Sequence, residues 1–100
     1  MLTRKGLKMS ISKCLRSYKV LKSKEVVTEE WGKHAHTNGY MFIDDLDNNR
    51  VILTWNDNDM SMNEKAKKVK ELFDILNYHG FEDYMELSPD QIEIYLTNFV

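Results

Sequence analysis

The most strongly patterned part of the chain runs from residue 50 to residue 80 and reads RVILTWNDNDMSMNEKAKKVKELFDILNYHG. Its first seven residues are mainly apolar and partly β-branched, which is typical of a central β-strand. Asp57-Asn58-Asp59 then interrupts the pattern with turn-forming residues. Ser61-Met62-Asn63-Glu64 has the form of a capping box, and Gly80 suits the position after a helix end. We therefore predict a strand over 50–56 and a helix from Ser61 to about His79.

The predicted helix is amphipathic. Its apolar residues recur at helical spacing, and opposite charges stand four residues apart on the other side. The expected buried stripe consists of Met62, Ala66, Val69, Leu72, Phe73 and Leu76, and the expected pairs are Glu64/Lys68, Lys67/Glu71 and Lys70/Asp74.

Two further strands are predicted upstream of residue 50. A β-prone stretch covers 26–36, and Asn38-Gly39 is a strong two-residue turn signal because both residue types tolerate positive φ. A strand over Tyr40–Asp44 follows, and residues 45–49 have turn chemistry. We therefore expect a three-stranded meander over 26–56.

The last residues admit two interpretations, because Ser88-Pro89-Asp90-Gln91 is typical both of a helix start and of a turn. The alternation of apolar and polar residues after Gln91 favours strands. We predict a closing hairpin formed by Tyr84–Leu87 and Ile92–Phe99.

Near the beginning of the chain, Ser10 is the expected N-cap of a helix whose apolar residues are Ile11, Cys14, Leu15, Tyr18 and Leu21. Residues 1–9 lack a clear period and are predicted to be mobile. The resulting expectation is a single α+β domain over 10–100. Its element order is α-β-β-β-α-β-β, with an antiparallel sheet packed against two helices.

Composition narrows the class of protein. The chain has 100 residues, 42% of them apolar, which suits one domain with its own core. Its single cysteine excludes an internal disulfide and favours a cytoplasmic location. No stretch approaches the roughly 18 apolar residues that a membrane-spanning helix needs, so no membrane role is expected. The surplus of Lys and Asn over Arg and Ala hints at an AT-rich phage or mobile-element genome.

Charge is unevenly distributed along the chain. The first 24 residues hold eight Lys and Arg and no acid, whereas the whole chain has a net charge of −2. Cations on one helical face can neutralise nucleic-acid phosphates. Nucleic-acid binding is therefore an alternative function, with Arg4, Lys5, Lys8, Lys13, Arg16, Lys19 and Lys24 as the expected contacts.

Acids gather around the two predicted hairpins, where clustered charge would attract a basic partner. The preferred hypothesis is a small non-catalytic regulator or inhibitor that binds a basic protein, such as a host nucleic-acid enzyme or defence protein. Asp and Asn also favour turns for local reasons, which is the simpler explanation. The expected protein-binding residues are Asp44, Asp45, Asp47, Asp57, Asp59, Glu82, Asp83 and Glu86, with Trp31 and Tyr40 as aromatic anchors unless these pack in the core.

Catalytic and metal-binding motifs are absent from the sequence. No nucleophile stands beside a base in a known local pattern, and no phosphate-cradling glycine loop occurs. Residues 45–56 begin like a calcium loop but have Arg50 where glycine is needed. His34 and His36 are too few for a zinc site without a third ligand. We expect no enzyme activity, no cofactor and no metal.

Self-association is a further alternative. A free strand edge at Ile92–Phe99 would pair with a second copy of the chain, because uncovered edges invite such pairing.

Overall fold

The computed structural model describes residues 3–27, 34–36, 38–57 and 59–96, with the backbone alone for 25–27 and 34–36. In chain order the elements are α1 (Arg4–Ser17), β1 (Glu25–Val27), β2 (His34–His36), β3 (Gly39–Asp45), β4 (Arg50–Asn56), α2 (Met62–Tyr78), the 3-10 turn η1 (Glu82–Tyr84), β5 (Met85–Ser88) and β6 (Gln91–Tyr95). The predicted class is confirmed: the fold is α+β, with an antiparallel sheet packed against two helices.

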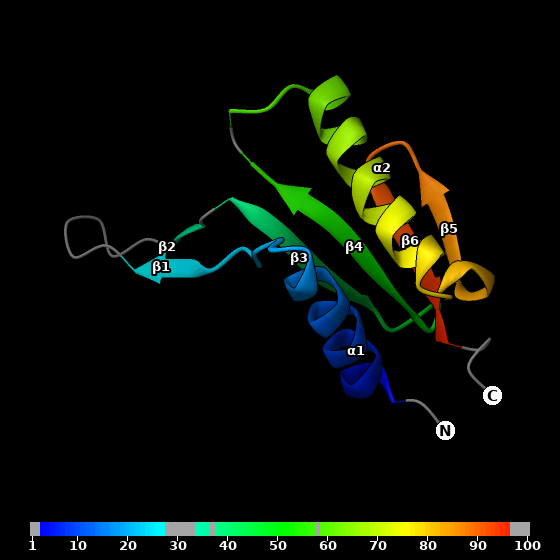
Figure 1. Cartoon of the computed structure of the whole chain (residues 1–100). Coiled ribbons are helices and arrows are strands. Elements are labelled where there is room, and N and C mark those ends of the chain that lie inside the picture. The colour runs from blue at the N-terminus through cyan, green and yellow to red at the C-terminus, as the bar shows by residue number, and fades with distance from the viewer. Residues whose placement is uncertain (1–2, 28–33, 37, 58, 97–100) are drawn as a thin grey trace.

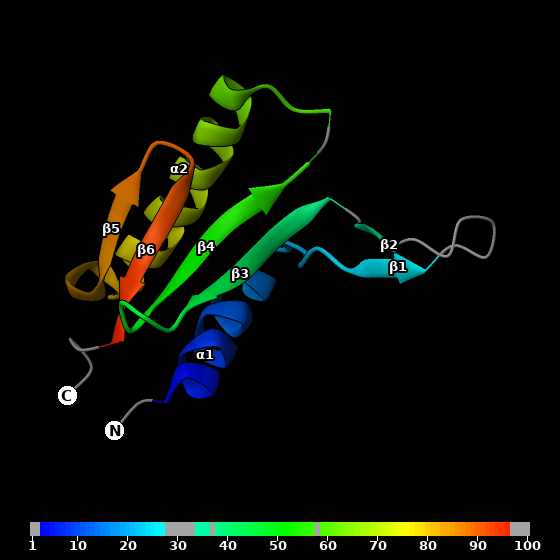
Figure 2. The ribbon, with the colours of Figure 1, turned by 180° about the vertical axis from the view of Figure 1, so that it is seen from behind.

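The main sheet has four antiparallel strands in the order β3-β4-β6-β5. Both helices cover the same face of this sheet, α1 on the β3 side and α2 on the β6 side (Figure 1). From behind, Figure 2 shows no helix over the opposite face. The core is therefore a single layer between helices and sheet, and the other sheet face is open.

Side chains alternate between the two faces of each strand, and those on the helix side form the sheet's part of the core. Leu53 stands opposite Phe42 on one side and Ile92 on the other, and Val51 stands opposite Ile94. Leu53, Val51, Ile92 and Ile94 are fully buried. The helices contribute two apolar stripes of fully or almost fully buried residues, Leu7, Ile11 and Leu15 from α1 and Val69, Leu72 and Leu76 from α2.

Helix α2 confirms the sequence prediction closely. The Ser61 hydroxyl accepts a hydrogen bond from the Glu64 backbone N–H at 3.2 Å, as an N-cap does. Gly80 has φ of 92°, a left-handed conformation that glycine adopts at a helix end with little strain because it has no Cβ. Of the predicted stripe, Met62 differs, because it is 64% exposed in the first turn.

Helix α1 begins earlier than predicted. Thr3, rather than Ser10, is the N-cap, and its hydroxyl accepts from the Gly6 N–H at 3.0 Å. The helix ends at Ser17, and Lys19 has a positive φ of 61°. Most of the segment predicted to be mobile is therefore helical, because Leu7 continues the buried stripe by one turn.

The predicted three-stranded meander is only partly present. β3 and β4 form the expected hairpin, but β1 and β2 pair with each other in a separate two-stranded sheet. This small sheet projects away from the main one (Figure 1). Asn38-Gly39 therefore does not connect paired strands. Gly39 has another role, since a Cβ there would lie 2.5 Å from the Leu21 carbonyl oxygen and the Ser23 nitrogen.

The C-terminal hairpin is confirmed as β5 and β6, but its position in the sheet differs from the prediction. β6 pairs with β4 on one side and β5 on the other, so it is an inner strand. The predicted free edge at Ile92–Phe99 is therefore wrong for the described residues 92–95, and residues 97–99 lie outside the described part. Strand order depends on long-range pairing, which the local pattern does not specify.

Candidate nucleic-acid interface

A groove lies along the outer side of α1, between the helix and residues 20–24. Seven cations line it, and no acid is among the described lining residues. The lining consists of Arg4, Lys5, Gly6, Lys8, Met9, Ser10, Ser12, Lys13, Arg16, Val20, Leu21, Lys22, Lys24 and Tyr40. Its volume of about 1300 Å³ exceeds the roughly 300–1,000 Å³ of typical small-molecule pockets. A groove of this size and charge suits an extended anionic ligand.

The helical wall of the groove follows from the amphipathic pattern of α1. Leu7, Ile11 and Leu15 are buried against the sheet at intervals of four residues. Because side chains four residues apart share a face, packing of this stripe directs Lys5, Lys13 and Arg16 away from the core. The apolar stripe thus fixes where the cations point.

The second wall is held on the start of β3. The Ser23 N–H donates to the Tyr40 carbonyl at 2.8 Å, and the Tyr40 N–H donates to the Leu21 carbonyl at 3.2 Å. Gly39 permits this close approach, as its missing Cβ leaves room for the neighbouring backbone. The Lys22 ammonium lies 5.8 Å from the centre of the Phe42 ring, a cation–π contact.

One carboxylate lies against the beginning of the groove. Asp44 Oδ1 is 2.6 Å from Lys8 Nζ and 3.5 Å from Arg4 Nη1. The hydrogen bond from Lys8 holds the pKa of the Asp44 carboxyl below its ordinary value, with Arg4 acting in the same direction. Arg4 also donates to the Arg50 carbonyl at 2.6 Å, which ties α1 to β4. Two of the lining cations are thus already partnered by an ionised acid.

The helix itself adds to the positive field. The first turn of α1 contains no acid, and Arg4, Lys5 and Lys8 stand near its positive end. Cations at this end are electrostatically unfavourable for the helix, which makes an anion there stabilising. Asp44 is the anion that the fold supplies.

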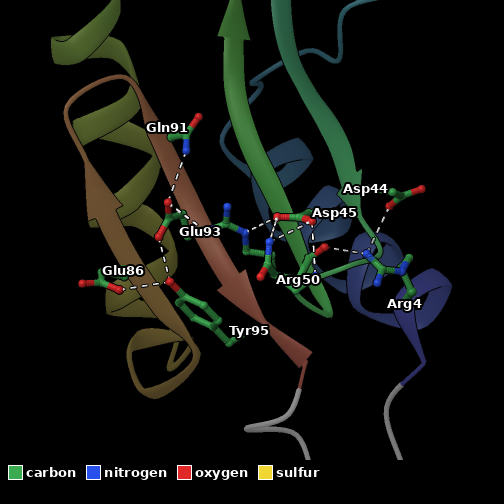
Figure 3. A network of polar contacts seen from close by, with 9 residues as sticks. Arg4, Asp44, Asp45, Arg50, Glu86, Gln91, Glu93 and Tyr95 are labelled. Carbon is green, nitrogen blue, oxygen red and sulfur yellow. Dashed lines mark hydrogen bonds and ion pairs between the residues drawn. The ribbon is translucent and has the colours of Figure 1, made fainter.

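A second polar cluster lies on the open face of the sheet (Figure 3). Arg50 is central, with Nε 2.5 Å from Asp45 Oδ2 and Nη1 3.0 Å from Glu93 Oε1. The Tyr95 hydroxyl lies 2.7 Å from Glu93 Oε2 and 3.2 Å from Glu86 Oε2. The cluster thus joins the ends of β3 and β4 to β6 and β5.

These contacts shift the titration of the cluster. Hydrogen bonds from Arg50 and then Asn48 lower the pKa of Asp45. The Tyr95 hydroxyl lowers the pKa of Glu93, and the same hydrogen bond raises the pKa of Tyr95. Both carboxylates are therefore ionised and engaged at neutral pH. The polar groups of the cluster are hydrogen-bonded to one another, which is typical of a structural network.

The structure brings together most of the basic residues predicted for nucleic-acid binding. Arg4, Lys5, Lys8, Lys13, Arg16 and Lys24 all line the groove. Lys19 does not, because the chain turns there with a positive φ. Lys22 joins the set. The only sequence signal for Lys22 was its position among the eight basic residues of segment 1–24, which contains no acid.

The acids predicted for protein binding do not form one surface. Asp44 faces α1 and Asp45 faces the open side, and each is paired with a cation. Asp57 and Asp59 follow the far end of β4, where the Asp57 carboxylate accepts the Asp59 N–H at 3.0 Å. The remaining acids, Asp47, Glu82, Asp83 and Glu86, are exposed around the end of the sheet that holds the β3–β4 turn and η1.

The two aromatic anchors have different outcomes. Tyr40 is only 3% exposed, and its ring meets Phe42 edge-on at 5.7 Å between centroids, so it belongs to the core. Trp31 lies outside the described residues. Tyr18 is 46% exposed, and its hydroxyl lies 2.7 Å from His79 Nε2, a contact between helix ends that the sequence did not predict.

Among the residues that the structure describes, no group of three or more His, Cys, Asp or Glu is placed to hold a metal ion. His34 and His36 lie on β2, whose side chains are outside the description. Burial raises the pKa of the Cys14 thiol, which disfavours the reactive thiolate. Neither described helix has the length and apolar character required to cross a bilayer.

Comparison with known proteins gives no further guide, since no family model, no curated protein and no solved structure matches this chain.

Proposed function

We propose that this chain is a non-catalytic nucleic-acid-binding protein that holds a phosphate backbone in the groove along α1. One observation carries the proposal: seven Lys and Arg side chains from two segments converge on one groove whose described lining contains no acid. Clustering of this kind is the electrostatic footprint expected of a phosphate-binding surface. The overall charge of −2 does not oppose it, because no acid is among the described lining residues, although Asp44 contacts two of the lining cations.

The interaction is expected to depend strongly on salt. Each phosphate neutralised by a cation releases condensed counterions, so the logarithm of the affinity falls by about 0.9 per contact for each tenfold rise in salt. If the five lining cations that do not contact Asp44 engage, the slope for a duplex is about −4.5. A slope near zero would contradict phosphate binding in the groove.

The test compares two variants that remove the same charge. Lys5→Gln/Lys13→Gln neutralises two groove cations, and Lys65→Gln/Lys67→Gln neutralises two on α2, outside the lining. Gln and Lys have similar helix propensities, so both variants are expected to fold. Fluorescence anisotropy with a labelled nucleic acid gives affinity at several salt concentrations. We expect only the groove variant to reduce the slope, by about 2. Equal losses in both variants would refute the groove as the binding site.

Protein binding is a second candidate function, and one observation favours it. Leu46 is 74% exposed at the tip of the β3–β4 turn, between Asp45 and Asp47. Glu82 and Asp83 of η1 are exposed at the same end of the sheet. An apolar side chain surrounded by acids suits a basic protein such as a nucleic-acid enzyme or a defence protein.

Affinity capture from cell lysate after nuclease treatment tests this second candidate. A basic protein retained by the native chain and lost with Leu46→Asp would support it. Recovery of the same proteins with both chains would exclude the turn as the contact.

A further inference from the structure

The groove offers no exposed aromatic ring in its described lining. Tyr40 is the aromatic residue there, and it is 3% exposed. The exposed Tyr18 and Tyr78 lie outside the lining, and both rings contact His79. Proteins that hold single strands without regard to sequence stack successive bases on exposed aromatic rings. The described lining of this groove has no such platform.

The described lining also has only part of the side-chain set that reads base edges. It contains no Asn, Gln, Asp or Glu, which recognise adenine and cytosine edges. Of its two arginines, Arg4 is held by Asp44 and by the Arg50 carbonyl. Arg16 and the lysines remain to contact guanine, and Ser10 and Ser12 do not discriminate between bases. Contacts limited to guanine are insufficient for a sequence code.

The cations extend along most of the length of α1. Lys5 and Arg16 are eleven residues apart on the same side of α1, a span of about 16 Å at 1.5 Å per residue. One strand of a duplex presents a phosphate about every 3.4 Å along the axis and completes a turn in about 34 Å, so this span covers about half a turn and faces only some of its roughly five phosphates. Lys22 and Lys24 border the groove from the other wall. A duplex holds its phosphates in this spacing before binding, whereas a single strand has to be ordered.

Resting on the proposed function, we infer that the ligand of the groove is a nucleic-acid duplex, held by one phosphate backbone without regard to base sequence. The cations contact phosphates along α1 and residues 22–24. Met9 and Leu21, which are 63% and 71% exposed, provide apolar surface for the sugars that lie between these phosphates. DNA and RNA duplexes share this chemistry.

The experiment measures the affinity of the full chain for four labelled probes by anisotropy. They are a DNA duplex of about two helical turns, the same duplex with a scrambled sequence, an RNA duplex, and one of the DNA strands alone. At 0.1 M salt we expect a DNA or RNA duplex to bind about tenfold more tightly than the single strand. About five contacts with slopes of 0.9 and 0.7 each give affinities that differ by about one logarithmic unit when extrapolated from 1 M to 0.1 M salt. The scrambled duplex should bind equally.

Single-strand binding as tight as duplex binding would overturn the inference and leave the proposed function in place. A marked preference for one duplex sequence would also overturn it. Salt-dependent binding to none of the probes would overturn both.

A variant with an added aromatic ring provides an independent check. Leu21→Trp places an exposed ring in the groove, where Leu21 has little buried surface to lose. If missing stacking limits single-strand binding, this variant should raise the affinity for the single strand about fivefold or more, and by a larger factor than the affinity for the duplex. Unchanged single-strand affinity would contradict the inference.

Discussion

Replacing Asp44 with Asn should strengthen nucleic-acid binding. One oxygen of Asp44 lies 2.6 Å from Lys8 Nζ and 3.5 Å from Arg4 Nη1, so under the proposed function this carboxylate competes with a ligand phosphate for the two cations. Asn has nearly the same size but no charge. The substitution should therefore release two lining cations for phosphate contacts.

The size of the effect follows from counting these contacts. Two additional contacts make the slope of log affinity against log salt steeper by up to about 1.8. If the native chain and the variant bind equally at 1 M salt, the variant binds at most about 60-fold more tightly at 0.1 M salt. The cost in stability is small, because the Asp44 side chain is 42% exposed and surface ion pairs contribute about 0–1 kcal/mol.

The assay is a salt titration of duplex binding by anisotropy, with urea unfolding of the same samples. Asp47→Asn is the matched control, since it removes the same charge from an exposed turn position away from the groove. Unchanged or weaker binding by a folded Asp44→Asn protein would refute the reasoning. An equal gain in the control would show that net charge alone is responsible.

Two further predictions concern the polar cluster on the sheet and two glycines, Gly39 at the start of β3 and Gly80 after α2. Arg50→Met removes the partner of Asp45 and Glu93, whose pKa values are lowered in the fold. A lowered pKa contributes stability that is complete above the ordinary carboxyl range and is lost as pH falls through the lowered value. Urea unfolding should therefore show a lower midpoint for the variant at pH 7 and a smaller difference near pH 3, and a constant difference would count against the network. Gly39→Ala forces the neighbouring backbone apart and should destabilise the fold by about 1–3 kcal/mol, with weaker duplex binding as the second wall shifts. Gly80→Ala meets no atom within 4 Å but strains a φ of 92°, so it should cost about 1 kcal/mol and leave binding intact. Equal binding losses in both glycine variants would disprove the role of the second wall.

The parts of the fold that depend on local pattern could be predicted from the sequence. Helix α2 has its cap, stripe and terminating glycine in one continuous segment, and β5 and β6 are separated by a short turn. The residues that specify the type and ends of each of these elements lie close together in the sequence. Their boundaries therefore agree with the prediction to within a few residues.

The parts that depend on distant contacts could not be predicted. The insertion of β6 beside β4 and the separation of β1–β2 are decided by pairing across many residues. In the groove, the sequence supplied the cations but not the hydrogen bonds from residues 21–23 to Tyr40 that place the second wall. It also gave no sign that Asp44 would contact Lys8, 36 residues earlier.

The inner position of β6 also has a consequence for folding kinetics. The β3–β4 and β5–β6 hairpins and α2 are each local, whereas pairs such as Val51 and Ile94 close a long loop. Closing such a loop costs chain entropy before contacts compensate for it. We therefore expect the two hairpins and α2 to form early and the joining of β4 to β6 to be the rate-limiting step of folding.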